Sequence, residues 1–395
     1  MTEDERVAGL RQALADELER AGDLRSREWR RAVERVPRHL FVPEFFERTD
    51  IPDRGTLWAP VRRDDDRWLD LAYRDETWVT QLDRHLTPRD AAGPVGGDPT
   101  SSSTMPGLVV RMLEDLDVTD GASVLEIGTG TGYSTALMCE RLGDGSVTSI
   151  EVDPCIAANA AAALRRAGYA PNLVVGDGLD GDAGHAPYDR IIATCSVRTI
   201  PRAWLVQARP GARVLVTVTG WLGGYGLALL EVDGDGVAEG RFLPGTISFM
   251  VARPQAAPVI GDERWGAAFE ALADAEVRRA AVGPDVLRDW TGAFVAQLAV
   301  PTVVAQRMRV DGGPWVEYCL DTASGAVASL TPERGGGWTV RQAGPGRVWD
   351  DVEAAVLRWR DAGSPPQERF RIRTDGRVRS VWFDGADGPV SWASS

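Results

Sequence analysis

Apolar residues recur with two different periods along the middle of the chain. Between residues 107 and 253, short apolar runs typical of buried strands alternate with stretches in which apolar residues return every three or four positions, as in helices. The predicted helices are 107–116, 133–142, 154–167 and 201–208, and the predicted strands are 123–127, 146–152, 172–176, 189–195 and 212–218. This alternation predicts an α/β fold, with a mostly parallel sheet covered by helices on both faces. Two last segments, 226–232 and 246–252, predict an antiparallel hairpin pair.

The segment before this region is divided between helix and irregular chain. Residues 5–37 predict two short helices, because Leu10, Leu14 and Leu18 recur at helical spacing. Residues 43–106 predict irregular structure, since they hold many Pro and Gly residues and the long loop AAGPVGGDPTSSSTMP. A loop of that length is usually functional or poorly ordered.

Beyond residue 253 the composition changes, starting with the Pro- and Gly-rich stretch RPQAAPVIG. The predicted elements that follow are helices at 263–280, 284–298 and 350–361, strands at 302–310, 315–320, 326–331 and 338–342, and a hairpin that turns at Asp375-Gly376. We therefore predict three parts: N-terminal helices and substrate-covering loops (1–106), an α/β core (107–253) and a smaller C-terminal α+β domain (254–395).

The charge of the chain narrows the classes of function. All 44 basic residues are Arg, against 58 acidic residues, which gives a net charge of −14 over 395 residues. This balance argues against a broad nucleic-acid or anionic-membrane binder, because phosphate groups favour an excess of basic residues. The absence of Lys excludes Schiff-base chemistry and a P-loop or kinase lysine. Residues 1–253 carry 28 Arg against 39 acidic residues, and residues 254–395 carry 16 against 19.

The N-terminal sequence and the scattered Cys and His residues predict a cytoplasmic protein with reduced thiols. The acidic start MTEDERVAGL lacks the basic and apolar regions of a signal peptide, and no apolar run approaches the length of a membrane span. The candidate ligands fit no zinc pattern or disulfide scaffold, so we expect no metal. They are Cys139, Cys155, Cys195, Cys319, His39, His85 and His185.

A candidate nucleotide site begins at Glu126, in the run VLEIGTGTG. Gly128, Gly130 and Gly132 follow a buried strand and precede a helix, where their backbone N–H groups can approach a ligand closely. Glu151 ends the next strand and can accept both hydroxyls of a ribose. Asp177 follows the third strand and could accept a hydrogen bond from the amino group of an adenine. No Arg accompanies the glycines, so we expect S-adenosylmethionine rather than a ligand with phosphates.

Several segments, taken in order, resemble one enzyme family. WRRAVERVPRHLFVPEFF (29–46), VLEIGTGTGYSTALM (124–138), VVGDG (174–178) and PYDRIIATCSV (187–197) are similar to the motifs of protein-L-isoaspartate O-methyltransferases, and the resemblance covers roughly residues 5–253. It implies a Rossmann-like, S-adenosylmethionine-dependent enzyme that methylates a side-chain carboxylate in a polypeptide. It also implies cofactor contacts at Thr129, Tyr133, Val152 and Gly178, besides the residues named above.

The chain departs from this family at its substrate loop and at its C-terminal end. The family's Gln-Thr-Ile-Ser-x-Pro loop is replaced by a stretch that ends Ser102-Ser103-Thr104-Met105-Pro106, and the three hydroxyl residues are our candidates for orienting the substrate carboxylate. The family usually stops near the equivalent of residue 253. Both departures are similar to a branch associated with ribosomally made, modified peptides of the graspetide and lanthipeptide types, whose members esterify an Asp so that it closes to an aspartimide.

Three functions are therefore carried forward. The first is aspartimide formation in a modified precursor peptide, and the second is general repair of isoaspartyl residues in damaged proteins. The third is a non-catalytic peptide-binding protein that retains a cofactor pocket, which has little support because no cofactor position is visibly lost. Arg198 is either a solvated, helix-capping residue or contacts an acidic peptide, and the Trp-rich C-terminal domain is expected to help bind or shape the peptide.

Overall fold

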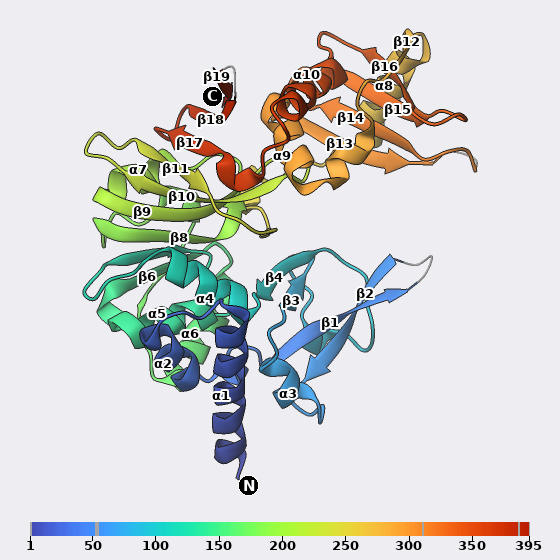
Figure 1. The fold of residues 1–395 in the computed structure, drawn as a ribbon. Coiled ribbons are helices and arrows are strands. Elements are labelled where there is room, and N and C mark those ends of the chain that lie inside the picture. Colours follow the sequence, from blue (N-terminus) through green and yellow to red (C-terminus); the bar gives the residue numbers. More distant parts are fainter. Residues whose placement is uncertain (1, 52–54, 310–311, 386–387, 395) are drawn as a thin grey trace. The chain divides into compact units, whose positions relative to one another are not determined.

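The computed structural model describes residues 2–51, 55–309, 312–385 and 388–394 (Figure 1). The chain divides into two units that interleave along the sequence. Unit 1 comprises Met1–Thr194, Val206–Leu215 and Val232–Gly234, and unit 2 comprises Cys195–Leu205, Val216–Glu231 and Asp235–Ser395. The domain boundaries at 106/107 and 253/254 stay predictions.

The sheet of unit 1 confirms the predicted α/β class. Its strands lie in the order β9-β8-β5-β6-β7, and β5 pairs in parallel with both β6 and β8, as β6 does with β7. The strands are β5 (Val124–Ile127), β6 (Val147–Glu151), β7 (Asn172–Val175), β8 (Tyr188–Val197) and β9 (Ala208–Thr219), and the helices are α4 (Pro106–Asp115), α5 (Tyr133–Leu142) and α6 (Pro154–Ala167). Residues at the ends of β8 and β9 belong to unit 2.

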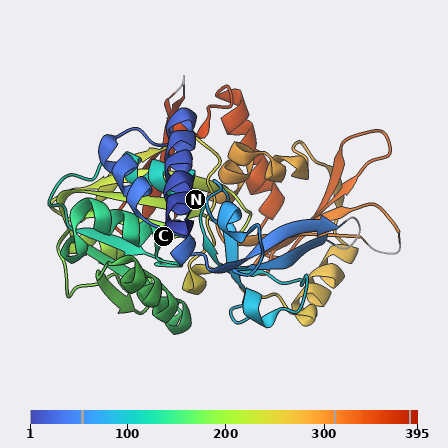
Figure 2. The ribbon, with the colours of Figure 1, turned by 90° about the horizontal axis from the view of Figure 1, so that it is seen from below.

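The two predicted N-terminal helices are present as α1 (Glu3–Ala21) and α2 (Arg27–Arg35), which pack against each other (Figure 2). Each begins at a hydroxyl residue that caps the free N–H groups of its first turn. Thr2 and Glu5 form a reciprocal capping box at α1, and the Ser26 side chain accepts from the Trp29 N–H at α2.

The prediction of irregular structure for residues 43–106 is wrong, since this segment forms a four-stranded antiparallel sheet. Its order is β2-β1-β3-β4, from β1 (Glu44–Ile51), β2 (Gly55–Arg62), β3 (Trp78–Leu82) and β4 (Pro99–Ser103), with the short helix α3 (Trp68–Ala72) between β2 and β3. The sequence hid these strands because the outer half of β1 is charged and exposed and β4 consists of polar residues. The buried core of this sheet is Phe46, Val79, Leu82 and Ala91.

Unit 2 contains two groups of strands. One has the order β19-β18-β17-β11-β10, and the other is a five-stranded sheet of order β12-β16-β15-β14-β13. The first group comprises β10 (Tyr225–Val232), β11 (Ala238–Phe242), β17 (Arg371–Thr374), β18 (Arg379–Gly385) and β19 (Gly388–Ser394). The second comprises β12 (Val277–Arg279), β13 (Val303–Met308), β14 (Val316–Asp321), β15 (Val327–Pro332) and β16 (Trp338–Ala343).

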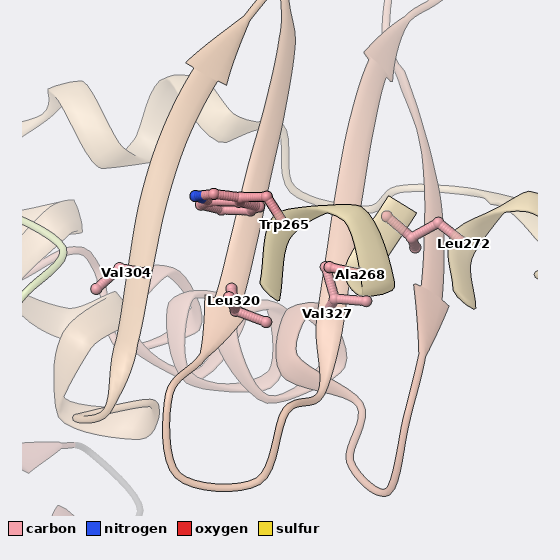
Figure 3. Packing of buried hydrophobic residues seen from close by; sticks show 6 residues of the cluster. All are labelled: Trp265, Ala268, Leu272, Val304, Leu320 and Val327. Atoms are coloured by element: carbon pink, nitrogen blue, oxygen red, sulfur yellow. The ribbon is translucent and has the colours of Figure 1, made fainter. Parts of the chain in front are cut away.

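Three helices of unit 2 are α8 (Asp262–Ala273), α9 (Trp290–Ala299) and α10 (Val348–Asp361), and the short α7 (Arg202–Gln207) begins in this unit. Figure 3 shows α8 lying on the five-stranded sheet, with Trp265, Ala268 and Leu272 pointing toward the strands. They form one buried cluster with Val304, Leu320 and Val327. Burial of these side chains holds the helix on the sheet.

Three sequence predictions in this region need correction, and one strand was missed. Strand β10 lies next to β11 rather than 246–252, and the latter segment hydrogen-bonds with Ser196 of β8 through Phe249, Met250 and Ala252. The helix predicted at 263–280 ends at Ala273, and β12 follows. The helix predicted at 284–298 is a 3-10 turn (Pro284–Arg288) followed by α9. Strand β19 was not predicted, and the last residue of the predicted strand 302–310 lies outside the described residues.

Candidate functional site

The glycine-rich turn between β5 and α5 is shaped by positive φ angles. Gly128 has φ 96° and Gly130 has φ 55°, which side chains other than glycine rarely adopt. The Thr194 hydroxyl donates to the carbonyls of Ile127 (3.1 Å) and Gly128 (2.5 Å), and it lies 2.7 Å from the position that a Cβ of residue 128 would take. Thr194, which the sequence analysis missed, therefore closes the base of the turn and requires a glycine there.

Glu126 lies beneath this turn, fully buried. Its carboxylate accepts hydrogen bonds from the hydroxyls of Ser134, Thr135 (2.5 Å) and Ser149 (2.7 Å). Burial raises the pKa of Glu126, while the three hydroxyl bonds act in the opposite direction. Ser149 also contacts the hydroxyl of Thr129 at 2.6 Å, so Glu126 connects β6, α5 and the turn from below. The polar residues of the strand SVTSIEV were the overlooked signal for Ser149.

Two further predicted acids lie at strand ends of the same sheet. Glu151, the last residue of β6, is nearly buried, and its carboxylate accepts from the backbone N–H groups of Gly130 (2.9 Å) and Asp153 (3.1 Å). The following residue, Val152, has 39% of its surface exposed. Asp177 follows β7 and accepts from the Leu179 N–H at 2.9 Å. The carboxyl ends of parallel strands share one edge of a sheet, where ligands of such folds bind.

Gly178, also in the predicted set, is packed against β5. A Cβ at this position would lie 2.5 Å from the Ile127 side chain, so a larger residue would displace the strand end from Asp177. Gly132, with φ 88°, caps the N-terminus of α5 and lies beside Ala160 and Leu164 of α6. Gly178 therefore lets the segment after β7 approach β5, and Gly132 lets the start of α5 approach α6.

Tyr133 opens α5 and is buried, and its hydroxyl has no hydrogen-bond partner among the described residues. Burial raises the pKa of Tyr133 to about 12. The Arg38 guanidinium lies 5.6 Å from its ring centroid and is itself fully buried, which lowers the pKa of Arg38 to about 10. Arg38 donates to the backbone carbonyls of Ala72, Arg74, Glu76 and Thr104. The sequence analysis did not single out Arg38, and its position in the Val-Pro-Arg segment was the signal for its contacts with these four carbonyls.

The hydroxyl residues Ser102 and Ser103 lie on strand β4 rather than in a loop. They pair with Val79 and Trp78 of β3. Successive side chains of a strand point to opposite faces, so the three predicted hydroxyls do not form one group. Ser103 is buried and its hydroxyl has no partner among the described residues, whereas Ser102 is half-buried. Thr104 follows the strand.

Strand β4 also lies against the glycine-rich turn. The Ser102 carbonyl oxygen is 3.4 Å from the position that a Cβ of Gly130 would take. The predicted substrate residues and the predicted nucleotide turn, distant in sequence, are therefore neighbours within unit 1.

The residues at this edge fit S-adenosylmethionine in charge and shape. Two carboxylates at strand ends suit ribose hydroxyls and an adenine amino group, Val152 offers an apolar surface beside them, and the glycines leave room for close backbone approach. In the described part of the chain, no group of three metal-binding side chains occurs. No helix formed by the described residues is both long and apolar enough to span a membrane.

Comparisons with known proteins agree with this geometry. A family model described as "Protein-L-isoaspartate(D-aspartate) O-methyltransferase (PCMT)" matches residues 72–236. The "Protein-L-isoaspartate O-methyltransferase 2" of Archaeoglobus fulgidus is 34% identical over 210 residues, which cover 53% of this chain and 78% of the relative. The "Protein-L-isoaspartate O-methyltransferase" of Methanopyrus kandleri is 32% identical over 222 residues, covering 55% and 81%.

A solved structure with the name protein-L-isoaspartate O-methyltransferase shares the fold of nearly the whole chain. It has a TM-score of 0.52 and 20% identity, and the match covers 97% of this chain and 99% of that one. The fold similarity therefore extends beyond residue 253, into the region that the sequence alone set apart.

Proposed function

Because the chain belongs to the protein-L-isoaspartate O-methyltransferase family, we propose that it transfers the methyl group of S-adenosylmethionine to the side-chain carboxylate of an isoaspartyl residue in a polypeptide. The observation that carries this proposal is the position of β4 beside the glycine-rich turn, with the Ser102 carbonyl next to Gly130. That neighbourhood supplies a cofactor edge and a hydroxyl-bearing strand in one unit.

The cofactor of this enzyme class is S-adenosylmethionine, which supplies an electrophilic methyl group bound to a sulfonium. In our proposal, Glu151 holds the ribose hydroxyls, Asp177 the adenine amino group and Val152 one face of the adenine. The turn at 128–132 contributes close backbone approach rather than free donors, because the N–H groups of Gly128 and Thr129 donate to the Ile150 carbonyl and those of Gly130 and Gly132 also donate within the turn region. In our proposal, Glu126 supports the shape of the turn rather than contacting the cofactor, because its carboxylate already accepts hydrogen bonds from three hydroxyls.

The substrate carboxylate needs orientation rather than activation. Its unperturbed pKa is about 4, so at neutral pH it is an anion and no strong base is required. As the carboxylate O–C bond forms, the methyl C–S bond breaks, and the products are a methyl ester and S-adenosylhomocysteine. The protein contributes by positioning the two reactants and limiting water. Ser103 is the leading hydroxyl for this task, since it is buried without a partner in the described chain, and Ser102 and Thr104 flank it.

A second candidate is methylation of an ordinary Asp in a modified precursor peptide. There, the next backbone nitrogen attacks the ester carbonyl, methanol leaves and an aspartimide forms. One observation favours it: the hydroxyl-rich segment 101–104, whose first three residues belong to β4, replaces the Gln-Thr-Ile-Ser of the family loop. The C-terminal region does not distinguish the two candidates, since a solved structure with the name protein-L-isoaspartate O-methyltransferase shares the fold over 97% of this chain.

Mass spectrometry of matched peptides tests both candidates. We expect an isoaspartyl peptide to gain the mass of one methylene when incubated with enzyme and S-adenosylmethionine, while its Asp isomer is unchanged. A cyclised, acid-rich precursor that first gains a methylene and then ends one water lighter than it began would favour the second candidate. If no peptide changes mass, the proposed activity is wrong.

A variant tests the cofactor assignment separately. Glu151→Gln should weaken S-adenosylmethionine binding at least tenfold in calorimetry, because a charge-assisted hydrogen bond is worth about 1.5–3 kcal/mol. The exposed Asp120→Asn is the matched control, since it removes one carboxylate from unit 1 away from the site. Equal affinities of the two variants would remove Glu151 from the ribose site.

A further inference from the structure

In unit 1, the antiparallel pairing of β3 with β4 is continued by side chains beyond the ends of the two strands. Thr77 Oγ1 accepts a hydrogen bond from the Met105 N–H at 3.0 Å. Two residues earlier, Asp75 Oδ1 accepts one from the Gly107 N–H at 2.6 Å. The stretch 72–77, which precedes β3, therefore follows the chain out of β4 as far as the first turn of α4.

The bond from Gly107 to Asp75 caps α4 from another segment. In the described chain, the N-cap residue of this helix, Met105, makes no side-chain hydrogen bond to the first turn, and the next residue, Pro106, has no N–H. Asp75 supplies an acceptor at the end of the helix where the helix dipole favours a carboxylate. One side chain thus satisfies the start of α4 and ties it to the stretch 72–77.

Asp75 is itself held on both sides by Arg38. The guanidinium of Arg38, which is fully buried, donates to the carbonyls of Arg74 at 2.8 Å and Glu76 at 2.9 Å. It also donates to the Thr104 carbonyl at 3.4 Å, on the other side of the connection. The buried cation therefore fixes the backbone that carries Asp75 relative to the segment that Asp75 binds.

The approach of Asp75 to α4 depends on a glycine. A Cβ at Gly107 would lie 2.7 Å from Asp75 Oδ2 and 2.9 Å from Asp23 Oδ2, so two carboxylates converge on this position. Burial raises the pKa of Asp75, and the charges of Asp23 and Glu17 act in the same direction. The Gly107 N–H and the charge of Arg38 act against them. The fold therefore keeps a carboxylate where its charge is costly, which is common at functional sites.

The connection from α4 back to β4 is stiff enough to transmit this position. Pro106 has a fixed φ, and it restricts the preceding Met105 to the extended conformation observed here, with φ −52° and ψ 132°. Ser103 ends β4 shortly before, and the carbonyl oxygen of Ser102 is 3.4 Å from the position that a Cβ of Gly130 would take. A displacement of the start of α4 therefore moves the candidate substrate strand relative to the cofactor turn.

We propose that Asp75 is a positioning residue for methyl transfer, which acts through the Gly107 N–H to hold β4 against the glycine-rich turn. The inference rests on the proposed function, because it takes β4 as the strand that orients the substrate. Asp75 contacts neither reactant and acts on the separation between them. Methyl transfer is sensitive to that separation, since a misplacement of about 1 Å can cost on the order of 100-fold in rate.

Kinetics with an isoaspartyl peptide at saturating S-adenosylmethionine test this role. Asp75→Ala removes the acceptor, and we expect kcat to fall by about tenfold or more while the Kd of S-adenosylmethionine changes by less than about twofold. Asp75→Asn keeps an oxygen acceptor of the same size, so it should retain most of the wild-type kcat.

Melting temperatures give a second reading of the Asn variant. The raised pKa means that the folded state disfavours the charged form of Asp75, so its stabilising effect is lost as the pH rises through that pKa. At neutral pH, Asp75→Asn removes this cost and should melt no lower than the wild type. A loss of kcat in Asp75→Asn as large as that in Asp75→Ala would count against the acceptor oxygen as the positioning group.

Asp289→Ala is the matched control. Asp289 caps α9, a helix of 10 residues like α4, and accepts from the Gly292 N–H at 2.6 Å, the same distance as in the bond to Asp75. Its removal should lower the melting temperature through loss of a helix cap and leave kcat unchanged. If Asp75→Ala fails to fold, Thr77→Val carries the test, because it removes the acceptor for the Met105 N–H and should lower kcat several-fold with unchanged cofactor affinity.

The outcomes separate this inference from the proposed function. Equal kcat in Asp75→Ala and wild type, or an equal loss in Asp289→Ala, would overturn the positioning role and leave the methyltransferase activity standing. A loss of S-adenosylmethionine affinity that accounts for the whole effect would overturn it as well. If no peptide is methylated, hydrogen exchange decides the inference. Asp75→Ala should then speed exchange at residues 99–110 and not at 133–142, and unchanged exchange at 99–110 would refute it.

Discussion

Two buried charged residues organise the candidate site at the scale of single side chains. Arg38 places its guanidinium under four backbone carbonyls, from Ala72 to Thr104, and Glu126 places its carboxylate under three hydroxyls. A buried charge is tolerated only when such partners satisfy it. Arg38 therefore fixes the start of the segment that follows β4, and Glu126 fixes the turn beside it. Arg38 and Glu126 are therefore positioning residues, which act on the site through the backbone carbonyls and the hydroxyls that they bind.

Glu126→Gln should change how stability depends on pH. Burial raises the pKa of Glu126 in the folded chain, so the folded state holds this proton more tightly than the unfolded state, where the pKa is about 4.3. The free energy of unfolding of the wild type therefore falls as pH rises from about 4 through the raised value, and this loss is absent in the variant. Urea denaturation at a series of pH values, from about 4.5, just above the unfolded-state pKa, to about 8, measures the difference in unfolding free energy between wild type and variant.

We expect the variant to gain stability relative to the wild type as the pH increases across this range. At the low end of this range the wild-type Glu126 is protonated and, like Gln, offers one carbonyl oxygen as acceptor to the surrounding hydroxyls, so we expect the two proteins to differ least there. A difference that stays constant with pH would contradict the assigned direction of the shift. Asp120→Asn controls for the removal of a surface charge.

At the scale of elements, the sequence predicted the parallel strands best. Strands β5 and β6 are buried throughout and β8 over most of its length, and each contains Val, Ile or Leu residues between turn signals, although β6 also holds Thr, Ser and Glu. Because strands and helices alternate, the glycine-rich turn after β5, Glu151 at the end of β6 and Asp177 after β7 are then expected at the same edge of the sheet. Strand β4 could not be predicted in this way, because its residues Pro99–Ser103 are polar and become a strand only through pairing with β3.

The separate faces of Ser102 and Ser103 could not be predicted either. Three consecutive hydroxyls in a loop would act together, whereas a strand directs alternate side chains apart. Likewise, no local pattern shows that Asp75 binds the N–H of Gly107, since their contact depends on the packing of α4 beside the stretch before β3. The site could be predicted where motifs are local, and not where the fold joins remote segments.

Gly130→Ala should weaken cofactor binding by tenfold or more, and Gly143→Ala should leave it unchanged. Both glycines have positive φ, 55° and 85°, so both substitutions strain the backbone, and the cost of about 1–3 kcal/mol is expected to be larger at Gly143, whose ψ of 148° lies outside the left-handed helical region. Only Gly130 lies against the Ser102 carbonyl and donates its N–H to Glu151, while a Cβ at Gly143 meets nothing. Calorimetry with S-adenosylmethionine and thermal melting measure the two effects separately.

This pair of variants separates strain from site geometry. A lower melting temperature in both variants with a selective loss of affinity at position 130 would support the assignment of the turn. An equal loss of affinity in both would mean that general destabilisation, rather than the turn beside β4, controls binding. An unchanged affinity in Gly130→Ala would place the cofactor away from this turn.

At the scale of the whole molecule, the path of the chain links the two regions that composition sets apart. Unit 2 takes strand β10, strand β11 and the segment after β8 from residues before 254, and it joins them to the C-terminal part. The Phe242 side chain of β11, fully buried, lies 4.9 Å from the Phe294 ring of α9. The backbone of β11 pairs with β17, from Ala238↔Thr374 to Arg241↔Arg371. The change of composition near residue 254 therefore falls inside unit 2.

A chain that ends at residue 253 should therefore fail to fold into a stable, monomeric enzyme. The truncation removes β17 from β11, Phe294 from Phe242 and the Gln367 side chain from the Tyr225 carbonyl, to which it donates at 2.7 Å. Strand β11 would become an unprotected edge and buried aromatic surface would be exposed, both of which promote aggregation. The full chain is the control, since removal of β19 would itself leave β18 as an edge and take Trp392 from Phe370 and Phe383. We expect size-exclusion chromatography to give aggregates for the truncated chain and one discrete species that binds S-adenosylmethionine for the full chain. A chain of residues 1–253 that melts cooperatively and binds the cofactor with wild-type affinity would instead establish residues 254–395 as an independent domain.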